Sequence, residues 1–171
     1  MSLLDSFIHG NDLTEIFIEN HNPHARQKLS TEAADALRQH IHAPDSLLAY
    51  ACGREVMSGS GVWAVTSSKF LIHHTVTQTV TALDLGQITL FEAVRGKYGH
   101  TVRVSAQGRN WAMYGTDKDL AGALHRALSA CGIASSFEDK PPRGTLWQAY
   151  SGPHPSAEQC LDDARQRLMA A

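Results

Sequence analysis

The strongest constraint on the fold is a run of seven short strand-like segments between residues 46 and 132, followed by one amphipathic segment. Their β-branched and aromatic residues, and their lengths of about 5–8 residues, favour strands over helices. Turn residues separate them, and Gln107-Gly108 is a two-residue hairpin signal. The seven predicted strands are residues 47–52, 62–66, 69–75, 79–85, 88–95, 101–106 and 109–114.

A helix is predicted directly after the seventh strand, because the period of the apolar residues changes there from two to that of a helix. Thr116 is a suitable N-cap residue, and Asp119 three positions later approximates a capping box. Gly132 is suited to end the helix in the left-handed conformation. The predicted apolar face consists of Leu120, Leu124, Ala127, Leu128 and Cys131. On this face Cys131 is expected to be a buried, inert thiol.

Two extensions flank this β-rich region. Residues 1–45 are predicted to be an N-terminal helical extension with a helix at about residues 30–42, capped by Ser30 or Thr31 and stopped by Pro44. Residues 133–171 are predicted to be a strap rich in proline and glycine, followed by a helix from about Ser156. Both helices carry narrow apolar stripes, so we expect them to pack on the β-rich region or on a neighbouring subunit.

Composition limits the class of protein. The 171 residues are 43% hydrophobic and 19% charged, which is typical of a globular chain and untypical of a disordered or membrane-spanning one. No basic segment precedes the first apolar residues, so we expect no secretory signal. The three cysteines, Cys52, Cys131 and Cys160, are odd in number and far apart. A disulfide framework is therefore not expected, and the pattern favours a cytoplasmic protein.

The charge distribution argues against binding to nucleic acid. Residues 46–132 contain eight Lys or Arg and five Asp or Glu, a net charge of +3, whereas the whole chain has a net charge of −2. Nucleic-acid binding usually requires a denser basic cluster and a basic isoelectric point. We expect protein partners, and membrane association is not favoured.

Five segments, taken in order, resemble the bacterial pleckstrin-homology-like domains. They are residues 48–54 (LAYACGR), 61–73 (GVWAVTSSKFLIH), 81–88 (TALDLGQI), 102–105 (VRVS) and 116–121 (TDKDLA). The second and third follow the rhythm of that family most closely. The resemblance covers residues 46–132, about half of the chain, and includes no catalytic signature.

The resemblance implies a mainly β fold with helices, of the α+β class. It predicts a seven-stranded sandwich or barrel of four and three strands, capped at one corner by the helix after Thr116. Such domains act as non-catalytic binding or assembly modules. In the eukaryotic relatives, basic residues of the first hairpin bind phosphoinositide headgroups. The corresponding residues 52–69 contain only Arg54 and Lys69, with Glu55 beside the first, so headgroup binding is not favoured.

Candidate partner-binding residues are the basic side chains of the β-rich region and one aromatic residue of the strap. Arg95 and Arg103 form a small positive patch with their neighbours if they pair across a hairpin, although a solvated hairpin that protects sheet edges explains the same charges. Trp147 is a candidate anchor of the strap to the domain or to a partner. The complete set is Arg54, Lys69, Arg95, Lys97, Arg103 and Trp147.

We predict no catalytic residue, metal or cofactor. Adjacent His73 and His74 must point to opposite faces of a strand, and no histidine has acidic or thiol partners at metal-ligand spacing. No nucleophile elbow, P-loop or dinucleotide fingerprint occurs in the sequence. The leading hypothesis is a non-enzymatic module that acts through protein–protein contacts and self-associates into a homo-oligomer. The alternatives are a domain that binds an anionic lipid or small ligand, and a hydrolase with an unrecognised site.

Overall fold

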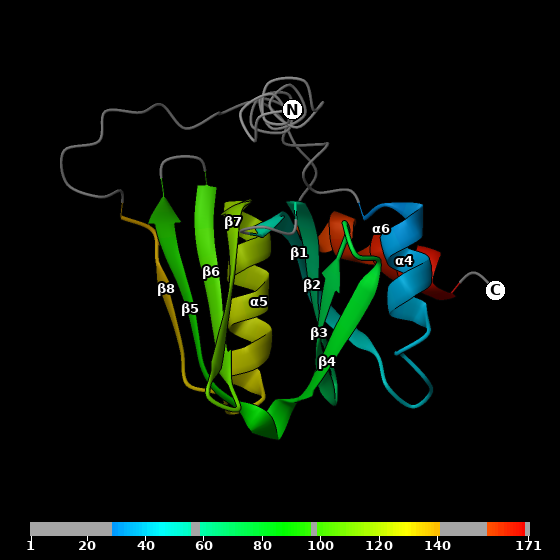
Figure 1. The fold of residues 1–171 in the computed structure, drawn as a ribbon, viewed down its shortest axis with the longest axis horizontal. Helices are drawn as coiled ribbons and strands as arrows, with labels where there is room; N and C mark the ends of the chain where they lie inside the picture. The colour runs from blue at the N-terminus through cyan, green and yellow to red at the C-terminus, as the bar shows by residue number, and fades with distance from the viewer. Residues whose placement is uncertain (1–28, 56–58, 97–98, 141–156, 170–171) are drawn as a thin grey trace, which may run out of the picture.

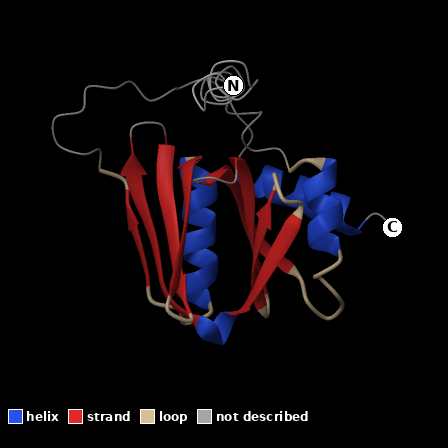
Figure 2. Cartoon of the chain, viewed as in Figure 1, coloured by secondary structure: helices blue, strands red, loops and turns tan. Residues whose placement is uncertain are grey.

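The structure is a computed structural model that describes residues 29–55, 59–96, 99–140 and 157–169. It is mainly β with a few helices, an α+β arrangement (Figure 2). Its elements in chain order are α4 (Thr31–Arg38), β1 (Leu47–Glu55), β2 (Gly59–Thr66), β3 (Lys69–His74), β4 (Thr79–Asp84), the short 3-10 helix η1 (Leu85–Gln87), β5 (Ile88–Gly96), β6 (Gly99–Ala106), β7 (Arg109–Thr116), α5 (Lys118–Ala130), β8 (Ser135–Glu138) and α6 (Ala157–Met169).

The strands form one sheet in the order β4-β3-β2-β1-β7-β6-β5-β8. Strands β1–β4 form one antiparallel meander and β5–β7 a second. Between the described residues of β1 and β7, two residue pairs join the two meanders, Arg54 with Tyr114 and Glu55 with Met113. The sheet bends at this junction, so that α5 lies between the two groups of strands (Figure 1).

All seven predicted strands are present, with ends that differ from the prediction by three residues or fewer. The described residues contain an eighth strand that the sequence did not predict. Strand β8 occupies the start of the segment predicted as a strap, and it runs parallel to β5. Its four residues, SSFE, contain no β-branched residue, so a local pattern does not identify them. The pairing forms because α5 returns the chain to the edge of the sheet at β5.

Strands β1, β2 and β3 are largely buried on both faces. Trp63 and Phe70 lie on one face, with their ring centroids 5.5 Å apart in an edge-to-face arrangement. Tyr50 lies on the opposite face, toward α6, and burial raises the pKa of its phenol. Since helices cover both faces, β2 is buried along six consecutive residues and its sequence, GVWAVT, lacks an apolar–polar alternation.

Helices α4 and α6 pack together against the outer face of the β1–β4 group (Figure 1). Arg38 of α4 donates hydrogen bonds to the carbonyl oxygens of Leu168 (2.9 Å) and Arg167. Arg167 in turn donates to the carbonyl oxygen of Leu29 at 2.7 Å. The buried apolar residues of this layer are Leu29, Ala33, Ala34, Leu37, Cys160, Ala164 and Leu168. The narrow stripes therefore cover one another within a single chain.

The start of α5 differs from the prediction by one residue. Asp117 is the N-cap, and its side chain accepts a hydrogen bond from the Asp119 amide at 2.8 Å. Thr116 is instead the last residue of β7 and is completely buried. Asp and Thr are both good N-caps, so the choice depends on where β7 stops pairing with β6. That register is a tertiary contact and is not visible in the local pattern.

The end of α5 agrees with the prediction at Gly132 and contradicts it at Cys131. Gly132 has a φ of 79°, the left-handed conformation expected after a helix. Cys131 is the C-cap residue and is exposed, because the apolar stripe ends one turn earlier at Leu128. The predicted burial of Cys131 is therefore wrong, whereas Cys160 in α6 is buried and burial raises its thiol pKa.

The helix predicted at residues 30–42 is present but shorter. Ser30 is its N-cap, as predicted, with a side chain that accepts a hydrogen bond from the Ala33 amide at 3.2 Å. The helix ends at Arg38, so His40 and His42 follow it rather than lie on it. None of the helices in the described part of the chain has both the length and the hydrophobicity that crossing a membrane requires.

Candidate functional site

The two basic residues predicted in the first hairpin lie far apart. Arg54 near the end of β1 is opposite Ser60 at the start of β2. Lys69 begins β3, directly before Phe70, which is opposite Val65 near the end of β2. Arg54 therefore lies at the start of β2 and Lys69 at its end. The two residues are at opposite ends of the β1–β4 group. The first hairpin does not combine them into one site.

The second predicted basic pair is also separated. Across the β5–β6 hairpin, Arg95 is opposite His100 and Arg103 is opposite Glu92. Arg95 and Arg103 therefore do not face each other, and the condition for the predicted positive patch is not met: the register of Gly96 opposite Gly99 continues as far as Leu90 opposite Ser105. Two further predicted residues lie outside the described residues, namely Lys97 and Trp147.

Arg95 belongs to an ion-pair cluster around Asp139, the residue that follows β8. Its Nη1 atom donates to Asp139 Oδ1 at 3.0 Å, and Lys118 Nζ lies 2.5 Å from Asp139 Oδ2. The hydrogen bond from Lys118 is the main cause of the lowered pKa of Asp139, and Arg95 contributes to it. The cluster connects the end of β8 to β5 and to α5. Arg95 thus helps to hold this strand in place.

Stacked rings support the same strand. The imidazole of His100 is completely buried and stacks on Phe137 of β8, with centroids 5.0 Å apart and planes at 14°. His125 of α5 lies against the same phenyl ring, with centroids 5.9 Å apart. His100 Nε2 is 3.6 Å from Asp139 Oδ1. Two of the ten histidines therefore act as packing residues of the edge at β8.

A surface cavity of about 240 Å³ lies beside the β2–β3 turn. Its lining is His40, His42, Pro44, Asp45, Ser67, Ser68 and Lys69. Burial acts to raise the pKa of Asp45, but hydrogen bonds from Ser67 and Ser68, among others, give a net downward shift. The cavity therefore presents an ionised carboxylate beside Lys69. This combination opposes the binding of an anion, so Lys69 does not create an anion site here.

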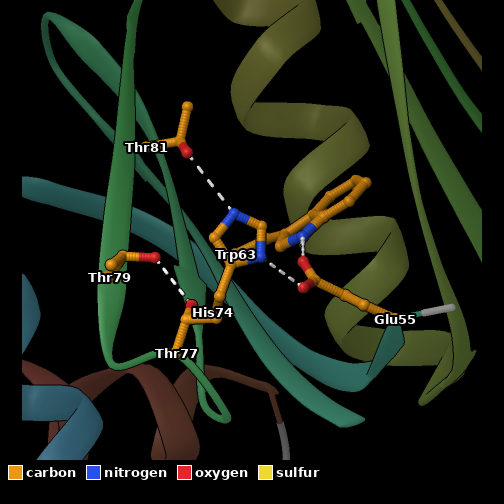
Figure 3. Close-up of polar contacts among 6 residues, drawn as sticks. All are labelled: Glu55, Trp63, His74, Thr77, Thr79 and Thr81. Atoms are coloured by element: carbon orange, nitrogen blue, oxygen red, sulfur yellow. Dashed lines mark hydrogen bonds and ion pairs between the residues drawn. The ribbon is translucent and has the colours of Figure 1, made fainter. Parts of the chain in front are cut away.

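A connected polar network takes one residue from each strand of the β1–β4 group (Figure 3). Trp63 Nε1 donates to Glu55 Oε1 at 2.9 Å. The second carboxylate oxygen, Oε2, is 2.5 Å from Nδ1 of His74. His74 Nε2 then lies 3.3 Å from the hydroxyl oxygen of Thr81. The network thus runs from a buried strand to the strand at the edge of the sheet.

This network has the connectivity of a carboxylate–imidazole–hydroxyl relay, in which a histidine oriented by an acid activates an alcohol. A structural role requires the same contacts. Glu55 is buried, and a buried carboxylate is stable only when its oxygens are hydrogen-bonded or paired. Trp63 likewise needs an acceptor for its buried N–H group. The polar network therefore fully accounts for the position of Glu55 as a structural residue.

Buried histidines make the stability of the fold depend on pH. Burial lowers the pKa of both His73 and His100, which are completely buried. In the unfolded chain their pKa returns to about 6.5, so below that pH the unfolded state binds more protons than the folded state. We therefore expect the urea concentration at the unfolding midpoint to decrease when the pH is lowered from 7 to 5. Each proton of difference lowers the free energy of unfolding by up to about 1.4 kcal/mol per pH unit.

A His100→Phe variant tests this assignment, because it keeps the stacking on Phe137 and removes the titrating group. Its urea midpoint should depend on pH less than that of the wild type. The matched control is His42→Asn, since His42 is exposed and should leave the dependence unchanged. Equal pH dependence in His100→Phe and the wild type would contradict the role of His100.

The outer strand β4 is an edge of the sheet, since among the described strands it pairs only with β3. Its six residues, TVTALD, pair with β3 without a register shift and include no proline, lysine or arginine. The only charged residue is Asp84 at the end of the strand. Natural proteins usually protect a sheet edge with proline, with charged residues such as lysine, or with a bulge. Val76, in the turn before β4, is 68% exposed. Strand β4 is therefore an accessible edge with the properties of a pairing surface.

This edge was missed at the level of the sequence. A run such as residues 79–85 predicts a strand, but whether it lies at the centre or the edge of a sheet depends on the order of the strands. A low content of charge was the available signal, since the run contains one ionisable residue.

Comparison with protein-family models gave no match, and no curated protein matches this chain. The geometry of the chain itself is therefore the basis on which we infer its function.

Proposed function

We propose that this chain is a non-enzymatic binding and assembly module that acts in the cytoplasm through protein–protein contacts, chiefly by self-association. We further propose that residues 46–132 form a pleckstrin-homology-like domain. A meander of four strands, a meander of three strands and a following helix, in that order, support this assignment. Strand β8 and the layer of α4 and α6 are then additions to the common core.

The observation that carries the proposal is the accessible edge of β4. An edge strand offers a row of backbone N–H and C=O groups, and pairing with another strand is the usual way to satisfy them. The other edge is formed by the four-residue β8, which is short and lies beside the Asp139 ion-pair cluster. Short, charge-flanked edges pair poorly with other chains, whereas β4 is longer and carries a charge only at its last residue, Asp84.

The edge of β4, and not the helical stripes, supports self-association. The sequence suggested that uncovered helical stripes need a partner, but α4 and α6 cover each other. The edge of β4 replaces those stripes as the surface that needs a partner.

Binding of an anionic ligand is less supported, because Arg54 and Lys69 are far apart and Arg95 is paired with Asp139. A hydrolase that used the carboxylate–imidazole–hydroxyl network would depend on His74, whose contacts a structural role explains.

Sedimentation velocity of the full chain tests the proposal. We expect the mean sedimentation coefficient to rise with concentration between about 1 and 100 µM, as a reversible dimer requires. A single monomeric species across that range would contradict self-association. Bovine serum albumin at matched concentrations serves as the control for non-ideality.

A further inference from the structure

We infer that a second copy of this chain pairs with the edge of β4 to form an antiparallel, two-fold symmetric β4–β4 ladder centred on Thr81. This inference rests on the proposed function and specifies which surface mediates it. The partner is another copy because the edge is complementary to itself in this orientation. A two-fold interface uses the same patch on both subunits, and an antiparallel strand pair is the simplest example.

The register with β3 shows which backbone groups of β4 point outward. The Leu85 amide donates to the Ser68 carbonyl at 3.1 Å, which marks these residues as a hydrogen-bonded pair. Hydrogen-bonded and non-hydrogen-bonded pairs alternate along an antiparallel ladder. In the observed register, Leu83, Thr81 and Thr79 therefore direct their backbone groups toward β3. The backbone groups of Val80, Ala82 and Asp84 point away from the sheet.

The hydrogen bond at the end of the strand supports this assignment. The Asp84 amide donates to Gln87 Oε1 at 3.1 Å, so the side chain of Gln87 already occupies the outward donor at this position. Among the described strands none pairs with the outward side of β4, so the N–H and C=O groups of Val80 and Ala82 are left for another strand. The free part of the edge therefore consists of two residues separated by Thr81.

These groups define one preferred register. If Val80 of one copy is opposite Ala82 of the other, the two residues exchange two hydrogen bonds, and symmetry provides two more. Thr81 then lies opposite Thr81 at the two-fold axis. A ladder centred on Val80 would instead pair Ala82 with Gln78, a turn residue with a φ of 53°. A ladder centred on Ala82 would place Asp84 beside Val80 and bury its charge against an apolar side chain.

Side chains along the preferred ladder are compatible. Two threonines face each other at the centre, and Thr–Thr is a favourable cross-strand pair. Thr79 is opposite Leu83, and both residues lie on the same face of the sheet. The single charged residue, Asp84, lies beyond the last pair, so no like charges are opposed. Close to the two-fold axis, the hydroxyl oxygen of Thr81 lies 3.3 Å from Nε2 of His74 in the same copy.

Cross-linking tests the register directly. Two residues of a non-hydrogen-bonded pair have Cα atoms about 4.5 Å apart, which is within the range that a disulfide spans. In a Cys131→Ser background, which removes the exposed native thiol, Thr81→Cys should give a covalent dimer on mild oxidation. The matched control is Thr79→Cys, which is opposite Leu83 in this register and should form at least about tenfold less dimer. Equal cross-linking of the two variants would overturn the register.

A second variant tests the edge without a new thiol. Ala82→Pro removes an outward N–H group and leaves the hydrogen bonds to β3 intact, which edge strands tolerate. We expect its dimer dissociation constant to rise at least about tenfold, with unchanged far-UV circular dichroism. If Ala82→Pro still dimerises as the wild type does, and Thr81→Cys does not cross-link, this inference is overturned but the proposed self-association stands. A wild-type chain that stays monomeric would overturn both.

Discussion

Trp63→Ala is expected to lower the free energy of unfolding by about 4 kcal/mol, close to the whole stability margin of many small domains. The indole is completely buried and packs edge-to-face on Phe70. Its removal leaves a large cavity beneath α5 and also removes the 2.9 Å hydrogen bond to Glu55. Urea unfolding followed by far-UV circular dichroism measures the loss without relying on tryptophan fluorescence.

Two variants separate packing from hydrogen bonding at this position. Trp63→Phe keeps most of the buried ring and leaves Glu55 without its indole donor, so we expect a smaller loss of about 1–3 kcal/mol. Trp111→Ala is the control for the loss of an indole elsewhere, since Trp111 is only partly buried. If Trp63→Ala costs less than Trp111→Ala, the central position of Trp63 in the core is contradicted.

Gly53→Val should be nearly as damaging, with an expected loss of about 3 kcal/mol or more. A Cβ atom at Gly53 would lie 2.7 Å from the carbonyl oxygen of Tyr114 and 2.6 Å from Cγ of Met113. The carbonyl oxygen is part of β7 and cannot move without the strand. Gly53 precedes Arg54 and Glu55, the described residues of β1 that pair with β7, so the clash acts directly on the junction of the two meanders.

Hydrogen exchange and urea unfolding together measure this effect. In Gly53→Val we expect faster exchange of the amides of β7 near Met113 and Tyr114, and a lower urea midpoint. Gly86→Val is the matched control, since a Cβ atom at Gly86 meets no atom within 4 Å. A Gly53→Val protein within about 1 kcal/mol of the wild type would show that the junction of the two meanders tolerates a separation.

The self-association proposal places a functional surface where neither hydrophobicity nor charge marks one. Strand β4 contains threonines, alanine and two branched apolar residues, and the pairing groups belong to its backbone. A search for basic residues, metal ligands or nucleophiles does not find such a surface. The six residues first considered as a site show this clearly. The four that the structure describes lie at separate places, and Arg95 is paired with an acid of the chain itself.

Local patterns were sufficient for the elements of the fold. Seven strands, the helix before them and the two helices after them follow from alternation, capping residues and helical spacing, which act over a few residues. Errors occurred where a distant contact decides the outcome. Strand β8 exists because β5 offers a partner, and Cys131 is exposed because the buried stripe of α5 ends at Leu128. The local sequence contains no signal of either contact.

The sequence by itself determined that this chain forms a β-rich domain with one long helix after the seventh strand, because the periodicity of side chains is a local property of each segment. Only the tertiary structure decided which strand lies at the edge, which charges are paired within the chain, and that α4 and α6 cover each other. These outcomes depend on the order of the strands and on contacts between residues more than a hundred positions apart, such as Arg38 with Leu168. The edge of β4, and with it the proposed function, belongs to this second group.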